Sequence, residues 1–145
     1  MGWLKKLLGM ESGDARTQPY RDVMRDYAAE RARVKEAGAV DGEHYTDHVE
    51  QVKQLKRDGR YDEAIELLAK LVDATESESR TAGPGWGVAP WYYEQLAIIY
   101  RKQKRLDDEV AILERYAAQP KAPGVGPSKL AERLEKAKQL ASKAR

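Results

Sequence analysis

Cysteine and phenylalanine are both absent from this chain of 145 residues. Without cysteine there is no disulfide framework and no thiolate that could act as a nucleophile or a metal ligand, which fits a reducing compartment. Because phenylalanine is absent, three tryptophans and eight tyrosines must provide the aromatic contacts of the core. No stretch approaches the ~20 apolar residues that a membrane-spanning helix requires. We therefore expect a cytoplasmic protein.

Motifs for catalysis are also missing. Residues 83–87 are rich in glycine, but they lack the Gly-Lys-Ser/Thr ending of a phosphate-binding loop, and the chain has no Gly-x-Ser-x-Gly nucleophile elbow. His44 and His48 stand four residues apart among acidic neighbours, yet no third ligand is placed as a zinc site needs. Asp107 and Asp108 begin a predicted helix, where the helix dipole explains them. We expect no enzymatic activity, no cofactor and no metal.

The composition favours helices with solvated faces. Charged residues make up 34% of the chain, the mean hydropathy is −0.77, and the formal net charge is only +2. This near balance argues against a general binder of polyanions. The charge is nevertheless uneven, because residues 121–145 hold seven Lys or Arg against Glu132 and Glu135.

Two stretches of the chain look alike at a fixed offset of 45 residues. Residues 60–68 (RYDEAIELL) align with residues 105–113 (RLDDEVAIL). The upstream segments agree at the same offset, in the pairs Val52 with Ala97, Leu55 with Tyr100, and Arg57 with Lys102. The echo predicts a repeated unit of helix, tight turn and helix. Because such a unit buries its apolar face only by stacking on a neighbour, the pattern favours binding over chemistry.

These residues resemble the tetratricopeptide repeat family. The second copy has the first-helix pattern of that family, and the first copy has its turn and second helix: Tyr93, Leu96, Ala97 and Tyr100, and Gly59, Tyr61 and Ala64. Lys104 replaces the turn glycine in the second copy, and Glu109 replaces the small residue. A carboxylate at that close contact would either splay the helices or shift the alignment. The resemblance covers residues 45–120, and the family's shorter unit of ~34 residues implies a loop insertion.

The positions of Gly, Pro and polar residues between the helical segments predict an all-α protein of about six helices, with two such units. Residues 1–18 form an amphipathic segment and a polar linker; residues 19–120 form the repeat domain, with a loop insertion at 76–90; residues 121–145 form a linker and a C-terminal capping helix. The helices are expected at about residues 19–35, 41–58, 61–75, 90–103, 106–118 and 129–144. The buried face of the first is marked by Tyr20, Val23, Met24, Tyr27, Ala28, Arg31 and Val34. Ser128 is the expected N-cap of the last, whose apolar stripe is Leu130, Leu134, Ala137 and Ala141.

The resemblance implies a concave groove lined by the first helix of each unit. Once the packing positions are set aside, the exposed set is basic with an apolar anchor: Lys53, Lys56, Arg57, Trp91, Glu94, Ile98, Arg101 and Lys102. We expect this groove to bind a protein or an acidic peptide segment, so that the protein acts as an adaptor. Trp86, in the insertion, is either a further contact to the partner or the residue that pins the loop.

The N-terminal nine residues carry a second candidate contact. Trp3, Leu4, Leu7 and Leu8 share one helical face, which can rest on a membrane surface, dock on a partner or fold back onto the repeats. The alternative function is therefore binding to nucleic acid or to an anionic membrane through this segment and the basic C-terminal helix. We do not expect binding to nucleic acid, because four acidic residues interrupt the basic surface: Asp41, Glu43, Asp47 and Glu50. Homo-oligomers can also form through the open ends of the stack.

Overall fold

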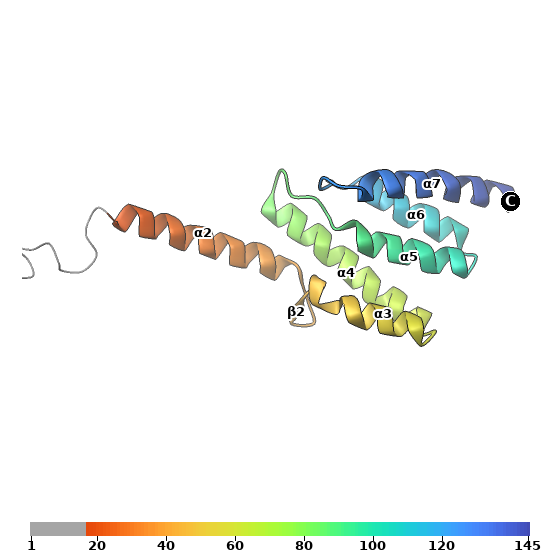
Figure 1. Ribbon diagram of the computed structural model, residues 1–145, viewed down its shortest axis with the longest axis horizontal. Helices are drawn as coiled ribbons and strands as arrows, with labels where there is room; N and C mark the ends of the chain where they lie inside the picture. Colours follow the sequence, from red (N-terminus) through yellow and green to blue (C-terminus); the bar gives the residue numbers. More distant parts are fainter. Residues whose placement is uncertain (1–16) are drawn as a thin grey trace, which may run out of the picture. The chain divides into compact units, whose positions relative to one another are not determined.

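The protein is all-α, as the sequence predicts. The computed structural model describes residues 17–145, in which six α-helices, α2 to α7, accompany one short hairpin and one 3-10 turn (Figure 1). The chain divides into two units, with the boundary between Val34 and Lys35. Within the described part of the chain, none of the helices combines the length and the apolar character needed to cross a membrane.

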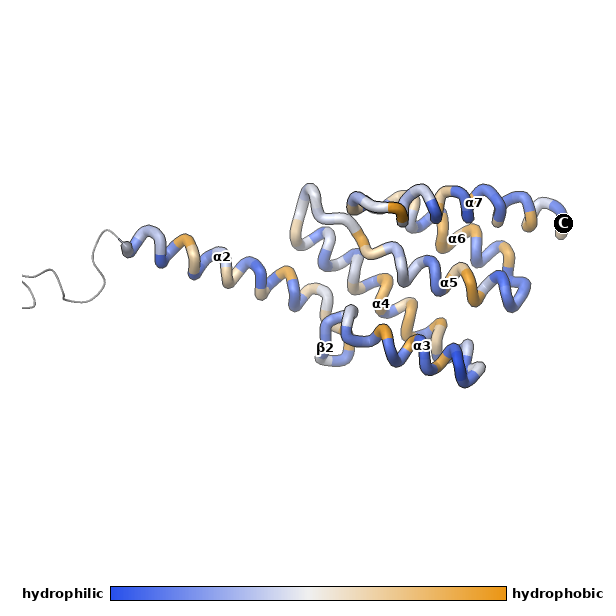
Figure 2. Tube along the Cα trace, viewed as in Figure 1, coloured by the Kyte–Doolittle hydropathy of each residue, from blue (hydrophilic) through white to orange (hydrophobic). Residues whose placement is uncertain are grey.

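Helix α2 spans Gln18–Ala37 and lies in the first unit as far as Val34. The residues predicted to form its buried face are exposed, apart from the half-buried Val34, so that prediction is wrong. The helical period shows which side chains share a face, but only a packing partner can bury that face. In Figure 2, hydrophobic positions recur along α2 between hydrophilic ones.

A two-stranded hairpin leads from α2 into the helical stack. Strands β1, Ala39–Val40, and β2, Glu43–His44, pair antiparallel, with Ala39 opposite His44. Asp41 and Gly42, between the strands, both have positive φ, 51° and 84°, as a tight turn of the primed type requires. A 3-10 turn at Tyr45–His48 follows and continues into α3, Val49–Arg57. The helix expected from about residue 41 is therefore replaced over its first eight residues by the hairpin and the 3-10 turn.

The second unit is a stack of helices in which neighbours along the chain pack together (Figure 1). Its members are α3, α4 (Tyr61–Ala82), α5 (Pro90–Lys102), α6 (Leu106–Ala117) and α7 (Gly126–Lys143). Helix α7 also reaches α5. The core lies along the facing sides of these helices, and its most completely buried large side chains are Tyr93, Leu68, Leu71, Leu96, Ile99, Leu113 and Leu130.

The sequence echo has a structural counterpart in the two helix turns. Gly59 and Lys104 both adopt positive φ, 70° and 59°. The hydrogen bonds around them also match: the N–H of Arg60 donates to the Leu55 carbonyl at 2.9 Å, and the N–H of Arg105 donates to the Tyr100 carbonyl at 2.8 Å. Both members are buried in four aligned pairs, Val52 and Ala97, Ala64 and Glu109, Leu67 and Ile112, and Leu68 and Leu113. Elsewhere burial differs, because Gln51 and Gln54 are exposed where Leu96 and Ile99 are buried. At Ala64 and Glu109 the 45-residue alignment thus pairs two buried positions.

Helix α4 is longer than the sequence predicts. It continues to Ala82, past the expected end near Thr75, so the connecting loop covers residues 83–89 instead of 76–90. Polar residues 76–79 look like loop in the sequence, but three of them, Glu76, Glu78 and Ser79, are buried. Tertiary hydrogen bonds to these side chains keep the segment helical.

The loop after α4 lies against the linker between α6 and α7. Val88 forms an isolated parallel bridge with Lys121, and its N–H donates to the Pro120 carbonyl at 2.9 Å. Gly87 allows this approach, because a Cβ at that position would lie 2.0 Å from the backbone nitrogen of Ala122. The two Gly- and Pro-rich segments, which look like separate linkers in the sequence, thus form one joint.

The C-terminal helix begins earlier than expected. Helix α7 starts at Gly126 after Val125, so Ser128 lies in its first turn and is not the N-cap; its hydroxyl donates to the Val125 carbonyl at 3.1 Å. The expected apolar stripe is confirmed, because Leu130, Leu134, Ala137 and Ala141 are all buried.

Candidate functional site

The predicted binding residues lie on two helices. Lys53, Lys56 and Arg57 are on α3, and Trp91, Glu94, Ile98, Arg101 and Lys102 are on α5. Helix α5 lies between neighbours in the stack, and six of its 13 residues are buried. Its exposed and half-buried positions are therefore the surface that α5 can offer to a partner.

One row of side chains runs along α5 at spacings of four, three and four residues. This row, the α5 stripe, consists of Trp91, Gln95, Ile98 and Lys102, which share one face of the helix. Trp91 and Ile98 are half-buried, and Lys102 is exposed. Trp91 also packs edge-on against Tyr92, with ring centres 5.1 Å apart. The stripe thus combines an aromatic and an aliphatic surface with a cation at one end.

Lys56 reaches the α5 stripe from α3. Its ammonium donates to the side-chain carbonyl of Gln95, which is buried. Burial lowers the pKa of Lys56, and the positive charge of Lys102 lowers it further, whereas Tyr61 and Glu94 act in the opposite direction. Within residues 17–145, no carboxylate lies within 4.0 Å of the ammonium of Lys56 or Lys102.

Lys102 leans over a ring from a third helix. Its ammonium lies 5.0 Å from the centre of the Tyr61 ring, at the start of α4. The neutral partners Gln95 and Tyr61 orient the two lysines without cancelling their charge. The two ammoniums and the apolar part of the α5 stripe are therefore suited to an anionic group that carries an apolar neighbour.

The other predicted groove residues have partners of their own. Lys53 pairs with Glu50 at 3.4 Å, and Arg57 donates to Gln54 at 2.7 Å, both within α3. Glu94, on α5, pairs with Lys129 of α7 at 3.1 Å. The structure thus brings Lys56, Ile98 and Lys102 toward one face, whereas Lys53 and Arg57 interact along their own helix.

Arg101 has a structural contact that the sequence does not reveal. Its Nε lies 2.9 Å from the carboxylate of Glu109, which is fully buried on α6, and Arg133 of α7 lies 3.0 Å from the same carboxylate. Glu109 was expected to splay the helices or shift the alignment. Instead, two arginines compensate the carboxylate and join α5, α6 and α7.

A second buried carboxylate joins α4, α5 and α6. Glu76 accepts a hydrogen bond from the hydroxyl of Tyr93 at 2.8 Å and two more from Arg115, each at 2.8 Å. Arg115 also reaches Asp73, at 2.7 Å. These hydrogen bonds raise the pKa of the Arg115 guanidinium, while burial raises the pKa of Tyr93. Like Glu109, Glu76 is therefore part of the framework that positions α5.

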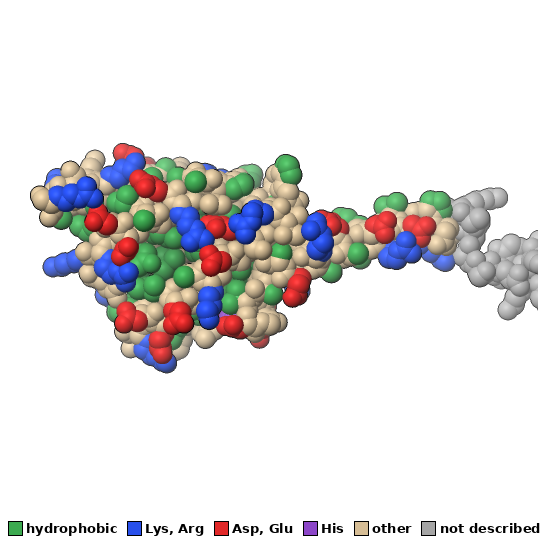
Figure 3. Space-filling view, turned by 180° about the vertical axis from the view of Figure 1, so that it is seen from behind, with side chains coloured by type: hydrophobic (Ala, Val, Ile, Leu, Met, Phe, Trp, Pro, Cys, Tyr) green, Lys and Arg blue, Asp and Glu red, His purple; other side chains and the backbone are tan. Residues whose placement is uncertain are grey.

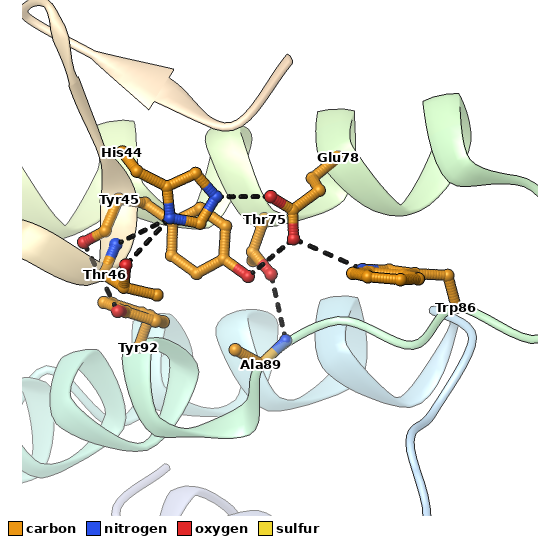
Figure 4. A network of polar contacts seen from close by, with 8 residues as sticks. All are labelled: His44, Tyr45, Thr46, Thr75, Glu78, Trp86, Ala89 and Tyr92. Carbon is orange, nitrogen blue, oxygen red and sulfur yellow. Dashed lines mark hydrogen bonds and ion pairs between the residues drawn. The ribbon is translucent and has the colours of Figure 1, made fainter. Parts of the chain in front are cut away.

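The third buried carboxylate, Glu78 on α4, accepts hydrogen bonds from three side chains (Figure 4). They are Nε2 of His44, the hydroxyl of Tyr45 at 3.0 Å and the indole N–H of Trp86 at 3.3 Å. On the other side of its ring, His44 Nδ1 accepts from the backbone N–H of Thr46 at 3.4 Å. Nδ1 also lies 2.8 Å from the hydroxyl oxygen of Thr46. A proton on Nε2 lets the ring donate a hydrogen bond to Glu78.

The Glu78 network fastens two loops to α4. Strand β2 supplies His44, the 3-10 turn supplies Tyr45, and the loop after α4 supplies Trp86 (Figure 4). The carbonyl of Trp86 also accepts a hydrogen bond from the Ser79 hydroxyl at 2.6 Å. Both ring nitrogens of His44 have partners within the protein. We interpret the arrangement as a clamp, and Trp86 as the residue that pins the loop, although its ring is still exposed.

Sequence reasoning named His44 as a possible metal ligand, but it missed the hairpin and the contact of His44 with Glu78. The dipeptide Asp41-Gly42 is a strong signal for a tight hairpin turn, and it lies inside the segment that the repeat pattern assigned to a helix. His48, the other histidine, turns elsewhere, with Nε2 at 2.9 Å from the Val40 carbonyl. Among residues 17–145, no three His, Cys, Asp or Glu side chains are grouped so that they could hold a metal ion.

Ion pairs to acidic residues lower the free positive charge of the C-terminal helix. Lys129 pairs with Glu94, Arg133 with Glu109, Lys138 with Glu135 and Arg145 with Asp107. Figure 3 shows one face of the molecule on which hydrophobic side chains gather among both basic and acidic ones. Because these basic side chains are paired with acidic ones, α7 offers less free positive charge for the binding of a polyanion. The other contact proposed for that function, at Trp3, Leu4, Leu7 and Leu8, lies outside the described residues.

Comparison with protein-family models, with curated proteins and with solved structures finds no match. The resemblance to tetratricopeptide repeats therefore remains a prediction, and the function rests on the geometry of the site.

Proposed function

We propose that this protein is a non-catalytic adaptor that binds an acidic peptide segment of another protein across α3 and α5. The observation that carries the proposal is the pair of ammoniums, Lys56 and Lys102, with no carboxylate within 4.0 Å in the part of the chain that the structure describes. Lys102 shares the α5 stripe with the half-buried apolar side chains of Trp91 and Ile98, and Lys56 reaches this stripe at Gln95.

The electrostatics favour an anion at this place. Burial and the charge of Lys102 both lower the pKa of Lys56, so its protonated form is disfavoured in the free protein. A carboxylate of a bound peptide would favour that form and would bind both ammoniums. The anion therefore interacts more strongly here than with an isolated surface lysine, whose ion pairs contribute ~0–1 kcal/mol.

The apolar part of the α5 stripe supplies the contact area. An aliphatic or aromatic residue of the peptide, next to its carboxylate, can pack on Ile98 and on the exposed edge of Trp91. Aromatic residues such as Trp contribute a large share of the affinity at many protein interfaces. The polar lysines then fix the orientation of the segment, and the apolar contact holds it.

Peptide capture tests this function. The immobilised full-length protein is exposed to a pooled set of eight-residue peptides that carry two carboxylates and one large apolar residue, and the bound peptides are identified by mass spectrometry. We expect capture to fall at least ~10-fold in a Lys56→Met, Lys102→Met variant, because both charges are removed while the aliphatic stems are kept.

The matched control changes two exposed lysines away from the site, Lys70→Met on α4 and Lys136→Met on α7. This variant should capture the same peptides as the unchanged protein. Equal capture by both double variants, with equal melting temperatures, would show that the two ammoniums do not form the binding site.

A further inference from the structure

Helix α2 exposes four large apolar side chains on one side. The exposed fractions are 67% for Tyr20, 64% for Val23, 46% for Met24 and 57% for Tyr27. Monomeric soluble proteins rarely leave such a row uncovered. Figure 3 shows hydrophobic side chains standing out along this helix.

The spacing along α2 is that of a helix-pairing seam. Positions three and four residues apart in alternation are Tyr20, Val23, Tyr27, Glu30, Val34 and Ala37. Five of the six are apolar or aromatic, and only Glu30 is charged. The residues that flank the seam include Met24, Asp26, Arg31 and Arg33. The helix carries five basic and four acidic residues, so it lacks the strongly basic polar face typical of a membrane-surface helix.

We propose that α2 pairs with α2 of a second copy of this chain, in antiparallel orientation. When the two seams are placed in register, Tyr20 faces the small Ala37 of the other copy, and Val23 faces Val34. Tyr27 then faces Glu30, so that the phenol can donate a hydrogen bond to the carboxylate. Each large side chain thus meets a small, apolar or hydrogen-bonding partner.

The charges select the antiparallel orientation. In that register Asp26 of one helix lies beside Arg33 of the other, and the symmetry of the pair repeats the contact. Arg33 already binds Glu30 of its own helix, with a shortest N–O distance of 2.6 Å, so the pairing builds a chain from Asp26 through Arg33 to Glu30 and Tyr27. A parallel pair would instead bury Glu30 against Glu30, where like charges repel.

The area that the two seams can bury determines the expected affinity of the dimer. Twenty residues of helix extend about 30 Å, and a pair of such helices buries an area at the low end of specific interfaces. We therefore expect a dimer with a dissociation constant on the order of 10 μM. At lower concentrations the chain is a monomer of 16.4 kDa.

Sedimentation velocity over a concentration series measures the association of the full-length protein. The weight-average mass should rise toward twice the monomer mass. Asp26→Arg should weaken the association at least ~10-fold, and Asp26→Arg with Arg33→Asp should restore most of it, because the second change reinstates opposite charges across the pair. Monomers at every concentration up to ~1 mM would overturn the proposal.

Cross-linking tests the orientation, and the absence of native cysteine makes it direct. Val23→Cys and Val34→Cys variants are oxidised separately and as a mixture. Paired helices bring facing Cα atoms within the range of a disulfide. The antiparallel pair should cross-link efficiently only in the mixture, because identical positions lie about 16 Å apart along the axis. Efficient cross-linking of either variant alone, with none added by mixing, would contradict the proposed orientation.

Discussion

The guanidinium of Arg101, on α5, lies 2.9 Å from the carboxylate of Glu109, on α6, at a position where the carboxylate is fully buried. Ala64 occupies the equivalent place in the first helix pair and is buried as well. The same site in the two pairs is thus filled once by a small apolar residue and once by an ion pair. The second solution needs both Arg101 and Arg133, because a buried carboxylate without a partner is strongly unfavourable.

We expect Glu109→Ala to lower the free energy of unfolding by about 3 kcal/mol. The substitution would leave Arg101 and Arg133 facing each other without the carboxylate that compensates them. Urea denaturation measures the change, with Glu114→Ala, an exposed position on the same helix, as the control. A Glu109→Ala variant as stable as the parent would mean that the ion pair contributes nothing net to the fold.

Charge reversal should have different effects on stability at the two arginines of the predicted groove, Arg57 and Arg101. Arg57 is exposed, so Arg57→Glu should change the free energy of unfolding by less than about 0.5 kcal/mol. Arg101→Glu places a second carboxylate beside Glu109 and should cost about 3 kcal/mol or more. Thermal melts of the two variants decide this. Equal melting temperatures would indicate that Arg101 is not bound to Glu109 in solution.

Two buried tyrosines make the fold sensitive to alkaline pH. Burial raises the pKa of Tyr45, and that of Tyr92, to about 12 from the ordinary value of 10.0. Because the pKa is higher in the folded state, the stabilisation is complete below pH 10 and is lost as the pH rises toward 12. At full ionisation each tyrosine would account for about 3 kcal/mol.

The measurement for the tyrosines compares the parent with a Tyr45→Phe, Tyr92→Phe variant. The variant loses the hydrogen bonds of both hydroxyls, so it should be less stable at neutral pH. The difference in unfolding free energy should then shrink between pH 10 and pH 12, because only the parent has these two hydroxyls to ionise. A difference that stays constant over this range would contradict the expected shifts.

Gly38 leaves room for the contact between His44 and Glu78. A Cβ at position 38 would lie 2.8 Å from both Nε2 of His44 and Oε2 of Glu78. We expect Gly38→Ala to cost about 1–2 kcal/mol, because the two side chains must move apart. In a His44→Ala background the same change should cost less, since one of the crowded groups is gone. Equal costs in both backgrounds would show that the histidine is not crowded.

The comparison of the two helix turns shows what the sequence alone can predict. The 45-residue echo predicted the turn at Lys104, and the structure confirms it with the same positive φ that Gly59 adopts. Turn geometry and helical periodicity depend on residues close along the chain, so they can be read from a single sequence. The buried stripe of α7 is confirmed for the same reason.

Only part of the candidate site could be predicted from the sequence. The sequence placed Lys56, Ile98 and Lys102 on exposed helix faces, and the structure keeps them near one surface. It could not show that Arg101 is bound to Glu109, because the two side chains meet across a helix pair. Nor could it show that Lys56 contacts Gln95 and Lys102 contacts Tyr61, since each of these neutral partners comes from another helix.

Local chemistry in the sequence thus determined the all-α class and most helix boundaries. The tertiary structure decided where helices end against their local preference, as when hydrogen bonds to Glu76, Glu78 and Ser79 extend α4 to Ala82. It also decided which apolar faces are covered: the stripe of α7 is buried, whereas Tyr20 and Tyr27 of α2 are exposed. Periodicity defines a face through neighbours along one helix, but burial requires a second surface, which only the folded chain or a partner can provide.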